Sequence, residues 1–74
     1  MKATINHTSV IRLIIPAQGF ATRLFLEWVA LSKFRGLNFY VIMSEREGEP
    51  VLIIKMGKSK EAYERARDYI NSNL

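Results

Sequence analysis

Apolar runs bounded by turn-forming residues divide this chain into short segments, and this division limits the fold more than any other feature. Residues 9–15 (SVIRLII) are rich in β-branched side chains and end at Pro16, which has no backbone N–H with which to continue a ladder. Residues 37–44 (LNFYVIMS) place side chains of different character on alternate sides, and residues 51–56 (VLIIKM) are mostly apolar. We therefore predict three strands over these ranges.

Two other segments have the composition of helices. Residues 20–34 contain no glycine or proline, and Gly36 follows at a position that suits a helix stop. Residues 60–73 follow Ser59, a residue type that caps helix starts, and carry an acidic residue in the first turn. We predict helices over both ranges, with residues 1–6 as a loose arm.

The order of these elements predicts an α+β fold, a two-layer βαββα sandwich formed by one domain over residues 1–74. A strand, a helix and a second strand form a right-handed unit with parallel flanking strands. The polar turn at residues 45–50 makes the second and third strands a hairpin. We expect the apolar third strand in the centre, which gives a three-stranded mixed sheet of order 1-3-2 with both helices on one face.

Composition argues against several kinds of function. The 74-residue chain has no cysteine and one histidine, so thiol catalysis and sites with several Cys or His ligands are excluded within one chain. His7 directly follows the predicted arm and has no neighbouring acid. We expect no catalytic residue, metal, cofactor or small-molecule substrate, hence no enzyme. With no apolar run of membrane-spanning length, we expect a cytoplasmic protein that does not bind a membrane.

The charge is basic, because eleven Lys and Arg residues outnumber seven Asp and Glu residues. A net charge of +4 favours anionic partners. Strand alternation predicts that Arg12, Tyr40 and Lys55 share the sheet face that the helices leave open. Cations interleaved with an aromatic ring suit single-stranded nucleic acid, and branched aliphatic residues on the same face also suit packing between two sheets. The predicted turns hold a second basic group: Lys33, Arg35, Lys58 and Lys60.

The first predicted helix is apolar around too much of its circumference for a two-layer domain. The residues expected to face the sheet are Phe20, Ala21, Leu24, Trp28 and Leu31. The apolar residues outside this stripe are Phe25, Leu26, Val29 and Ala30. This surplus predicts an interface with a second copy or another protein. In the alternative interpretation, the second helix and the N-terminal arm cover these side chains.

Two resemblances to known families follow from particular segments. Residues 36–74 resemble the second half of a KH domain, in which a strand, a variable loop, a strand, a glycine-containing turn and an alanine-bearing helix follow one another. The resemblance implies binding of single-stranded RNA or DNA. The GxxG loop of that family is absent here, and the continuous segment 20–34 stands in its place. Because that loop clamps the nucleic-acid backbone, no residue of it is carried over.

The second resemblance is to the HPr phosphocarriers of the sugar phosphotransferase system. Gly19-Phe20-Ala21-Thr22-Arg23 is similar to their active-site segment, with Ala21 at the position of the phosphorylated histidine. The chain is also shorter than that family by a strand and a helix. The resemblance therefore implies a phosphocarrier-like module that has lost phosphoryl transfer.

These observations rank three hypotheses. The first is a small, non-catalytic KH-like protein that binds RNA or another single-stranded nucleic acid through the basic residues and Tyr40. The second is a protein-binding regulator or inhibitor, such as a phage or viral accessory protein, that acts through the apolar surface of the first helix or as a homodimer. The degenerate phosphocarrier is third.

Overall fold

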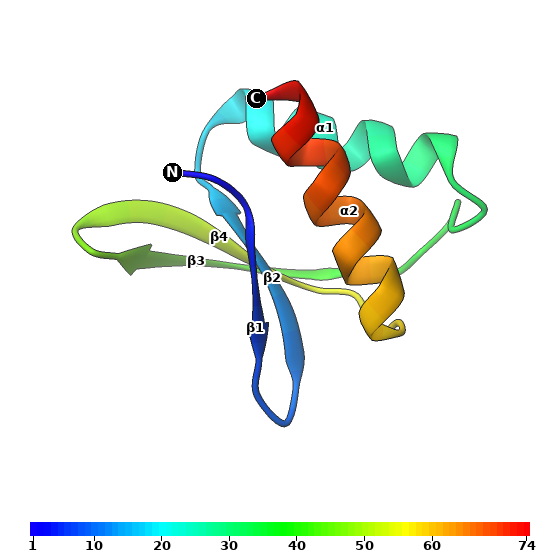
Figure 1. Cartoon of the computed structure of the whole chain (residues 1–74), viewed down its shortest axis with the longest axis horizontal. Coiled ribbons are helices and arrows are strands. Elements are labelled where there is room, and N and C mark those ends of the chain that lie inside the picture. Colours follow the sequence, from blue (N-terminus) through cyan, green and yellow to red (C-terminus); the bar gives the residue numbers. More distant parts are fainter.

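The computed structural model describes all residues, 1–74, as four strands and two helices (Figure 1). Their order along the chain is ββαββα. The elements are β1 (Thr4–His7), β2 (Ile11–Pro16), α1 (Gly19–Leu31), β3 (Tyr40–Arg46), β4 (Glu49–Lys55) and α2 (Lys60–Asn73).

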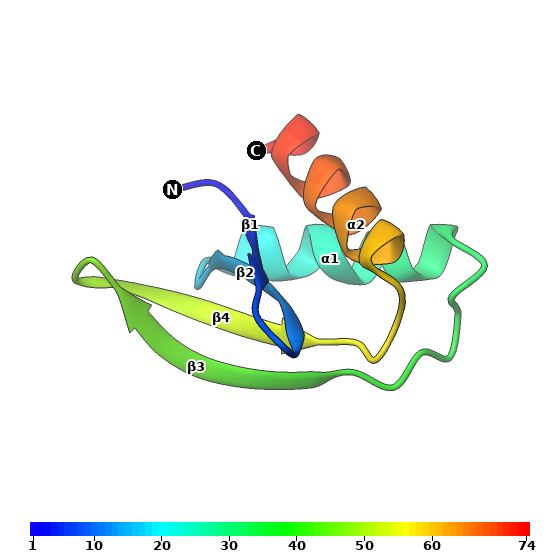
Figure 2. The same cartoon turned by 60° about the horizontal axis from the view of Figure 1, so that its bottom comes forward.

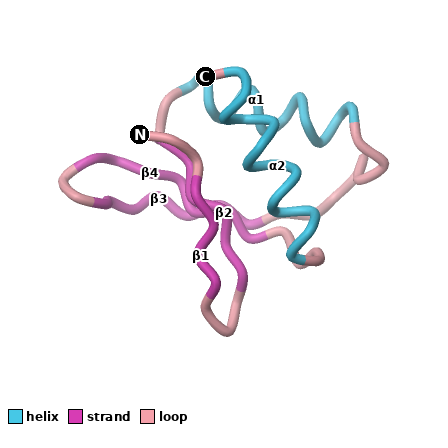
Figure 3. Tube along the Cα trace, in the orientation of Figure 1, coloured by secondary structure: helices cyan, strands magenta, loops and turns pink.

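The sheet consists of two antiparallel hairpins joined along their inner strands. Its strand order is β1-β2-β4-β3, and every neighbouring pair is antiparallel. The β1–β2 hairpin and the β3–β4 hairpin point in different directions (Figure 3). Glu47 and Gly48 form the second turn with φ of 51° and 81°, the positive values that a type I′ hairpin turn requires.

The predicted three-stranded mixed sheet and the βαββα order are therefore wrong. β4 does lie between β2 and β3, but the N-terminal segment that we expected to be a loose arm forms a fourth strand. β1 has only four residues and only Ile5 is strongly apolar, so its local sequence gives a weak strand signal. The strand exists because β2 has a second edge whose backbone groups need partners.

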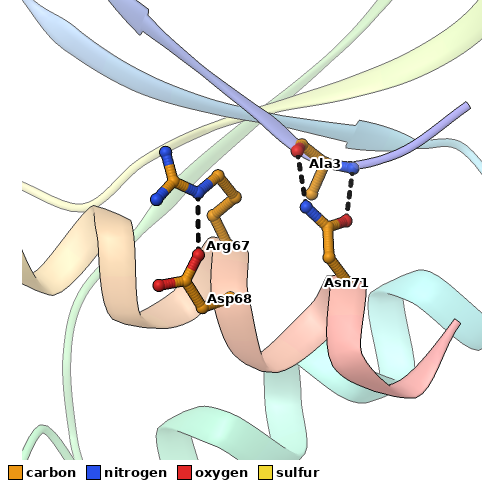
Figure 4. Close-up of polar contacts among 4 residues, drawn as sticks. All are labelled: Ala3, Arg67, Asp68 and Asn71. Carbon is orange, nitrogen blue, oxygen red and sulfur yellow. Dashed lines mark hydrogen bonds and ion pairs between the residues drawn. The ribbon is translucent and has the colours of Figure 1, made fainter.

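Asn71 of α2 fixes the start of this N-terminal strand. Its side-chain Oδ1 accepts a hydrogen bond from the Ala3 N–H at 2.8 Å, and its Nδ2 donates one to the Ala3 carbonyl at 3.0 Å (Figure 4). The amide thus bonds the strand backbone as a neighbouring strand would. Nearby on the same helix, Arg67 Nε donates to Asp68 Oδ1 at 3.0 Å. Ala3 is buried as a result of this docking.

Both helices lie on one side of the sheet, and β3 is the strand farthest from them (Figure 2). The helices pack on each other and on β1 and β2, while neither comes close to β3. All seven residues of β3 are exposed. The core between the layers consists of Ala3, Leu13, Ile15, Ala21, Leu24, Phe25, Trp28, Ile54, Met56, Tyr63, Ala66 and Ile70.

The core-facing stripe of α1 is shifted from the predicted one: Ala21, Leu24 and Trp28 are buried as expected, and three other residues differ. Phe25, expected outside the stripe, is 1% exposed. Phe20 and Leu31, expected inside it, are exposed. The helix is apolar on several sides, so hydrophobicity alone does not set its rotation; contact with α2 and with β2 decides it.

The open face of the sheet is also less open than strand alternation suggested. Ile14 and Val51 point away from the helix side, because their neighbours Leu13, Ile15 and Leu52 belong to or pack against the core. Both are nevertheless buried. The accessible residues of this face lie at its other end, at Arg12 and Lys55, and along β3, at Tyr40 and Ile42.

The second helix matches its predicted range, residues 60–73. It starts after Ser59, although the Ser59 side chain makes no capping hydrogen bond. Tyr63 anchors the helix to the end of β4: its buried hydroxyl oxygen accepts hydrogen bonds from the N–H groups of Met56, at 2.7 Å, and Gly57, at 3.3 Å.

We predict that Tyr63→Phe lowers the free energy of unfolding by about 1–3 kcal/mol, because it leaves the buried Met56 N–H without an acceptor. Tyr69→Phe is the matched control, since the Tyr69 hydroxyl makes only an exposed contact of 3.5 Å with Glu27. Urea denaturation of both variants measures the difference. Equal losses of stability in the two variants would contradict the anchoring role of Tyr63.

We also predict that Asn71→Ala detaches β1, because both backbone hydrogen bonds of Ala3 to this side chain are lost. Amide hydrogen exchange should then accelerate across Thr4–His7 more than in β4. Asn73→Ala is the control, since its side chain bonds only the Tyr69 carbonyl within the same helix. Unchanged protection of β1 in Asn71→Ala would show that the β2 ladder alone holds the strand.

Candidate nucleic-acid interface

A row of four aromatic rings connects the start of β3 to the end of α1. The Phe39 ring meets the Phe25 ring edge to face, with centroids 5.0 Å apart. Phe25 stacks against Trp28 at 6.0 Å, and Trp28 lies 5.7 Å from Phe34. Such contacts are favourable beyond the area they bury. The row therefore fixes Phe34, which follows the helix, relative to the sheet.

Two lysines from distant parts of the chain meet at the Phe34 ring. Lys33 Nζ lies 6.0 Å from the ring centroid, and Lys58 Nζ, from the turn between β4 and α2, lies 5.5 Å from it. Cations are attracted to the negative face of an aromatic ring at these distances. One lysine from each of the two basic pairs that the sequence placed in separate turns therefore lies at the same ring.

Two hollows flank the turn that carries Lys58. The larger, about 580 Å³, opens at the start of β3 and is lined by Asn38, Phe39, Tyr40, Lys55, Met56 and Gly57. The smaller, about 290 Å³, is lined by Lys33, Phe34, Ser59, Glu61, Ala62 and Arg65. Both combine basic and aromatic side chains. We call this end of the molecule, defined by these two hollows and Lys58, the basic end.

The strand register extends the basic end across the sheet. Tyr40 pairs with Lys55, and Asn6 pairs with Arg12. Continuing the β2–β4 register by one residue beyond Leu13 and Ile54 sets Arg12 opposite Lys55. Asn6, Arg12, Lys55 and Tyr40 thus form one row over all four strands, on the face away from the helices. Tyr40 is 64% exposed and Lys55 is exposed, while Arg12 is half-buried.

The other cations near this end differ in whether their side chains already form a hydrogen bond or an ion pair. Arg35 Nε donates to the Ala30 carbonyl at 2.6 Å, so this side chain satisfies the C-terminal end of α1. Lys60 is exposed as the first residue of α2. Arg65, which was not among the candidate contacts, is paired with Glu61 one helical turn away, as the spacing of these two residues predicts. The cations of the basic end without a hydrogen bond or ion pair are therefore Lys33, Lys55 and Lys58, and Lys60 is next to them in the chain.

The apolar interface that we predicted on α1 is smaller than expected. Phe25 lies in the core and not on this surface. Val29 is half-buried against the core, while Leu26 and Ala30 are exposed. Ala21, at the position of the histidine in the phosphocarrier-like segment, is fully buried.

Sequence reasoning missed the ring around which the lysines gather. Phe34 was assigned to the predicted helix, but the helix ends at Leu31 and the Phe34 N–H bonds the Ser32 hydroxyl in the turn that follows. The triplet Lys33-Phe34-Arg35, an aromatic residue between two cations, was the available signal. No local sequence pattern predicts that Lys58 lies close to this ring.

Comparison with known proteins found no matching family model, no curated relative and no matching solved structure. Neither helix has both the length and the hydrophobicity that crossing a bilayer would require.

Proposed function

We propose that this protein binds single-stranded nucleic acid, RNA or DNA, at the basic end. The observation that carries the proposal is the meeting of Lys33 and Lys58 at the Phe34 ring, next to a hollow lined by Tyr40 and Lys55. The lysines would contact phosphates, and an unpaired base would stack on the exposed Tyr40 ring. Stacking of this kind needs an unpaired base, so a single strand is the favoured ligand.

The distribution of charge along the sheet supports this site. Glu45, Glu47 and Glu49 lie at the β3–β4 turn, and Lys55 lies at the opposite end of the same hairpin. Seven strand residues separate these ends by roughly 20 Å, well beyond the Debye length at physiological salt. Along this hairpin the three glutamates, offset by Arg46 alone, lie far from Lys55, so an anionic polymer is attracted to the Lys55 end.

The KH-like order of residues 36–74 is a second support. β3, the turn, β4 and α2 follow one another as the resemblance implies, and Lys55, Lys58 and Lys60 belong to the β4–α2 part. No residue of a GxxG loop takes part in the proposal. Binding would rest on charge and stacking, which makes it tolerant of base sequence.

We predict that Lys55→Glu/Lys58→Glu weakens binding of labelled single-stranded RNA by about tenfold or more, because two phosphate contacts become repulsive. Replacing the same two residues by alanine should reduce the slope of log affinity against log salt by about 1.4. Fluorescence anisotropy at several salt concentrations measures both effects, with single-stranded DNA and duplex RNA compared in parallel.

The matched control is Lys2→Glu/Arg23→Glu, which changes net charge equally at two exposed positions outside the basic end. This variant should keep most of the affinity. Equal losses in the two double variants would show that only net charge matters, and absence of wild-type binding at low salt would remove the proposed function.

A further inference from the structure

The two edge strands of the sheet, β1 and β3, differ in how far the rest of the molecule covers them. At the β1 edge, the strand has four residues, and the Asn71 side chain occupies the outer backbone groups of Ala3. At the β3 edge, seven residues are exposed, and neither helix comes close. Proteins commonly protect free edges because an unpaired strand is a template for pairing with another. Only one edge of this sheet has such protection.

The uncovered strand is apolar on both of its faces. Tyr40 and Ile42 point away from the helix side, and Val41 and Met43 point toward it, as their pairing with β4 shows. All four are exposed, and Met43, at 65%, is the most exposed of them. The stretch from Tyr40 to Ser44 has no charge, proline or bulge, the usual devices against edge pairing.

The β3–β4 turn determines which backbone groups point outward. In a two-residue hairpin the pair next to the turn, here Arg46 and Glu49, is hydrogen-bonded, and the pairs then alternate. Pro50 has no N–H and lies opposite Glu45, which agrees with a non-hydrogen-bonded pair at that position. The N–H and C=O groups of Val41, Met43 and Glu45 therefore point to the free edge.

We propose that β3 pairs antiparallel with β3 of a second copy, about a two-fold axis at Met43. Met43 is the midpoint of the strand Tyr40–Arg46, so this register pairs the strand along its whole length. Val41 and Glu45 exchange hydrogen bonds with the partner's Glu45 and the partner's Val41, and Met43 with the partner's Met43. Every outward-pointing backbone group of the strand is then paired, and the two sheets join into one.

The side chains of the two strands are compatible in this register. Two-fold pairing in a continuous sheet sets residues of the same face opposite each other, and a centre at Met43 satisfies this requirement. Ile42 lies beside the partner's Ser44, and the exposed Met43 meets its own copy. Arg46 lies beside the partner's Tyr40, so no like charges are directly opposite. A strand of an unrelated protein would have a compatible pattern of side chains only by chance, whereas a second copy has it by symmetry.

Met43→Lys tests this interface, because it places two like charges opposite each other on the axis. Sedimentation of the wild-type chain without nucleic acid should show a concentration-dependent dimer, with the dissociation constant raised by about tenfold or more in Met43→Lys. Leu31→Lys, at an apolar α1 position that is 74% exposed, is the control and should leave the dimer intact. A monomeric wild type, or a dimer that only Leu31→Lys weakens, would overturn the proposal.

Cysteine cross-linking tests the register, since the chain has no cysteine of its own. Opposed Cα atoms of a hydrogen-bonded pair are about 5.5 Å apart, so Met43→Cys should form a disulfide-linked dimer on oxidation. Val41→Cys, on the same face, should not, because the two copies would be about 14 Å apart along the strands. Cross-linking through Val41→Cys and not through Met43→Cys would overturn the Met43 axis. Nucleic-acid binding is measured separately, so failure of one proposal is distinguishable from failure of the other.

Discussion

The antiparallel ladder between β2 and β4 is the interaction on which the rest of the structure depends. β1 joins the sheet only through β2, and β3 only through β4. Leu13 and Ile54 face each other across this ladder, and both are buried in the core that the helices cover. Loss of this one pairing would leave the β3–β4 hairpin without a partner, because the helices pack on β1 and β2, and an isolated two-stranded hairpin is marginally stable at best.

Unequal coverage of that sheet accounts for both surfaces to which we assign a role. The helices pack over β1 and β2 and leave β3 without a partner layer, which exposes an apolar strand with a free edge. At the start of the same strand, the aromatic row from Phe39 to Phe34 ends beside two lysines. In the proposed dimer the partner's Arg46 lies beside Tyr40, and the acidic turn of the partner subunit comes to this same end, so the two surfaces adjoin and each affects the charge at the other.

Local signals predicted some elements well and others poorly. The α2 range was confirmed because composition, a cap-type residue and a preceding glycine all indicated the same start. The three predicted strands exist with ends shifted by up to three residues, since ladder partners and turn geometry decide where a strand stops. β1 was missed because its local strand signal is weak, and its place depends on pairing with β2 and on Asn71, 68 residues away, which bonds Ala3 just before the strand. The stripe of α1 was predicted correctly at Ala21, Leu24 and Trp28 and wrongly at Phe20, Phe25 and Leu31, because a helix that is apolar on several sides has more than one possible rotation.

From the sequence alone come the division into strand-like and helix-like segments, the net positive charge, the exclusion of cysteine chemistry and the candidate cations. These properties belong to residue types and their local spacing, which limit backbone conformation and charge wherever the segment lies. Tertiary structure decided that Phe25 is buried, that Lys33 and Lys58 share one ring, and that β3 has no cover. Each of these depends on which distant segments pack against a residue. Local sequence does not specify those contacts, and only the folded chain determines them.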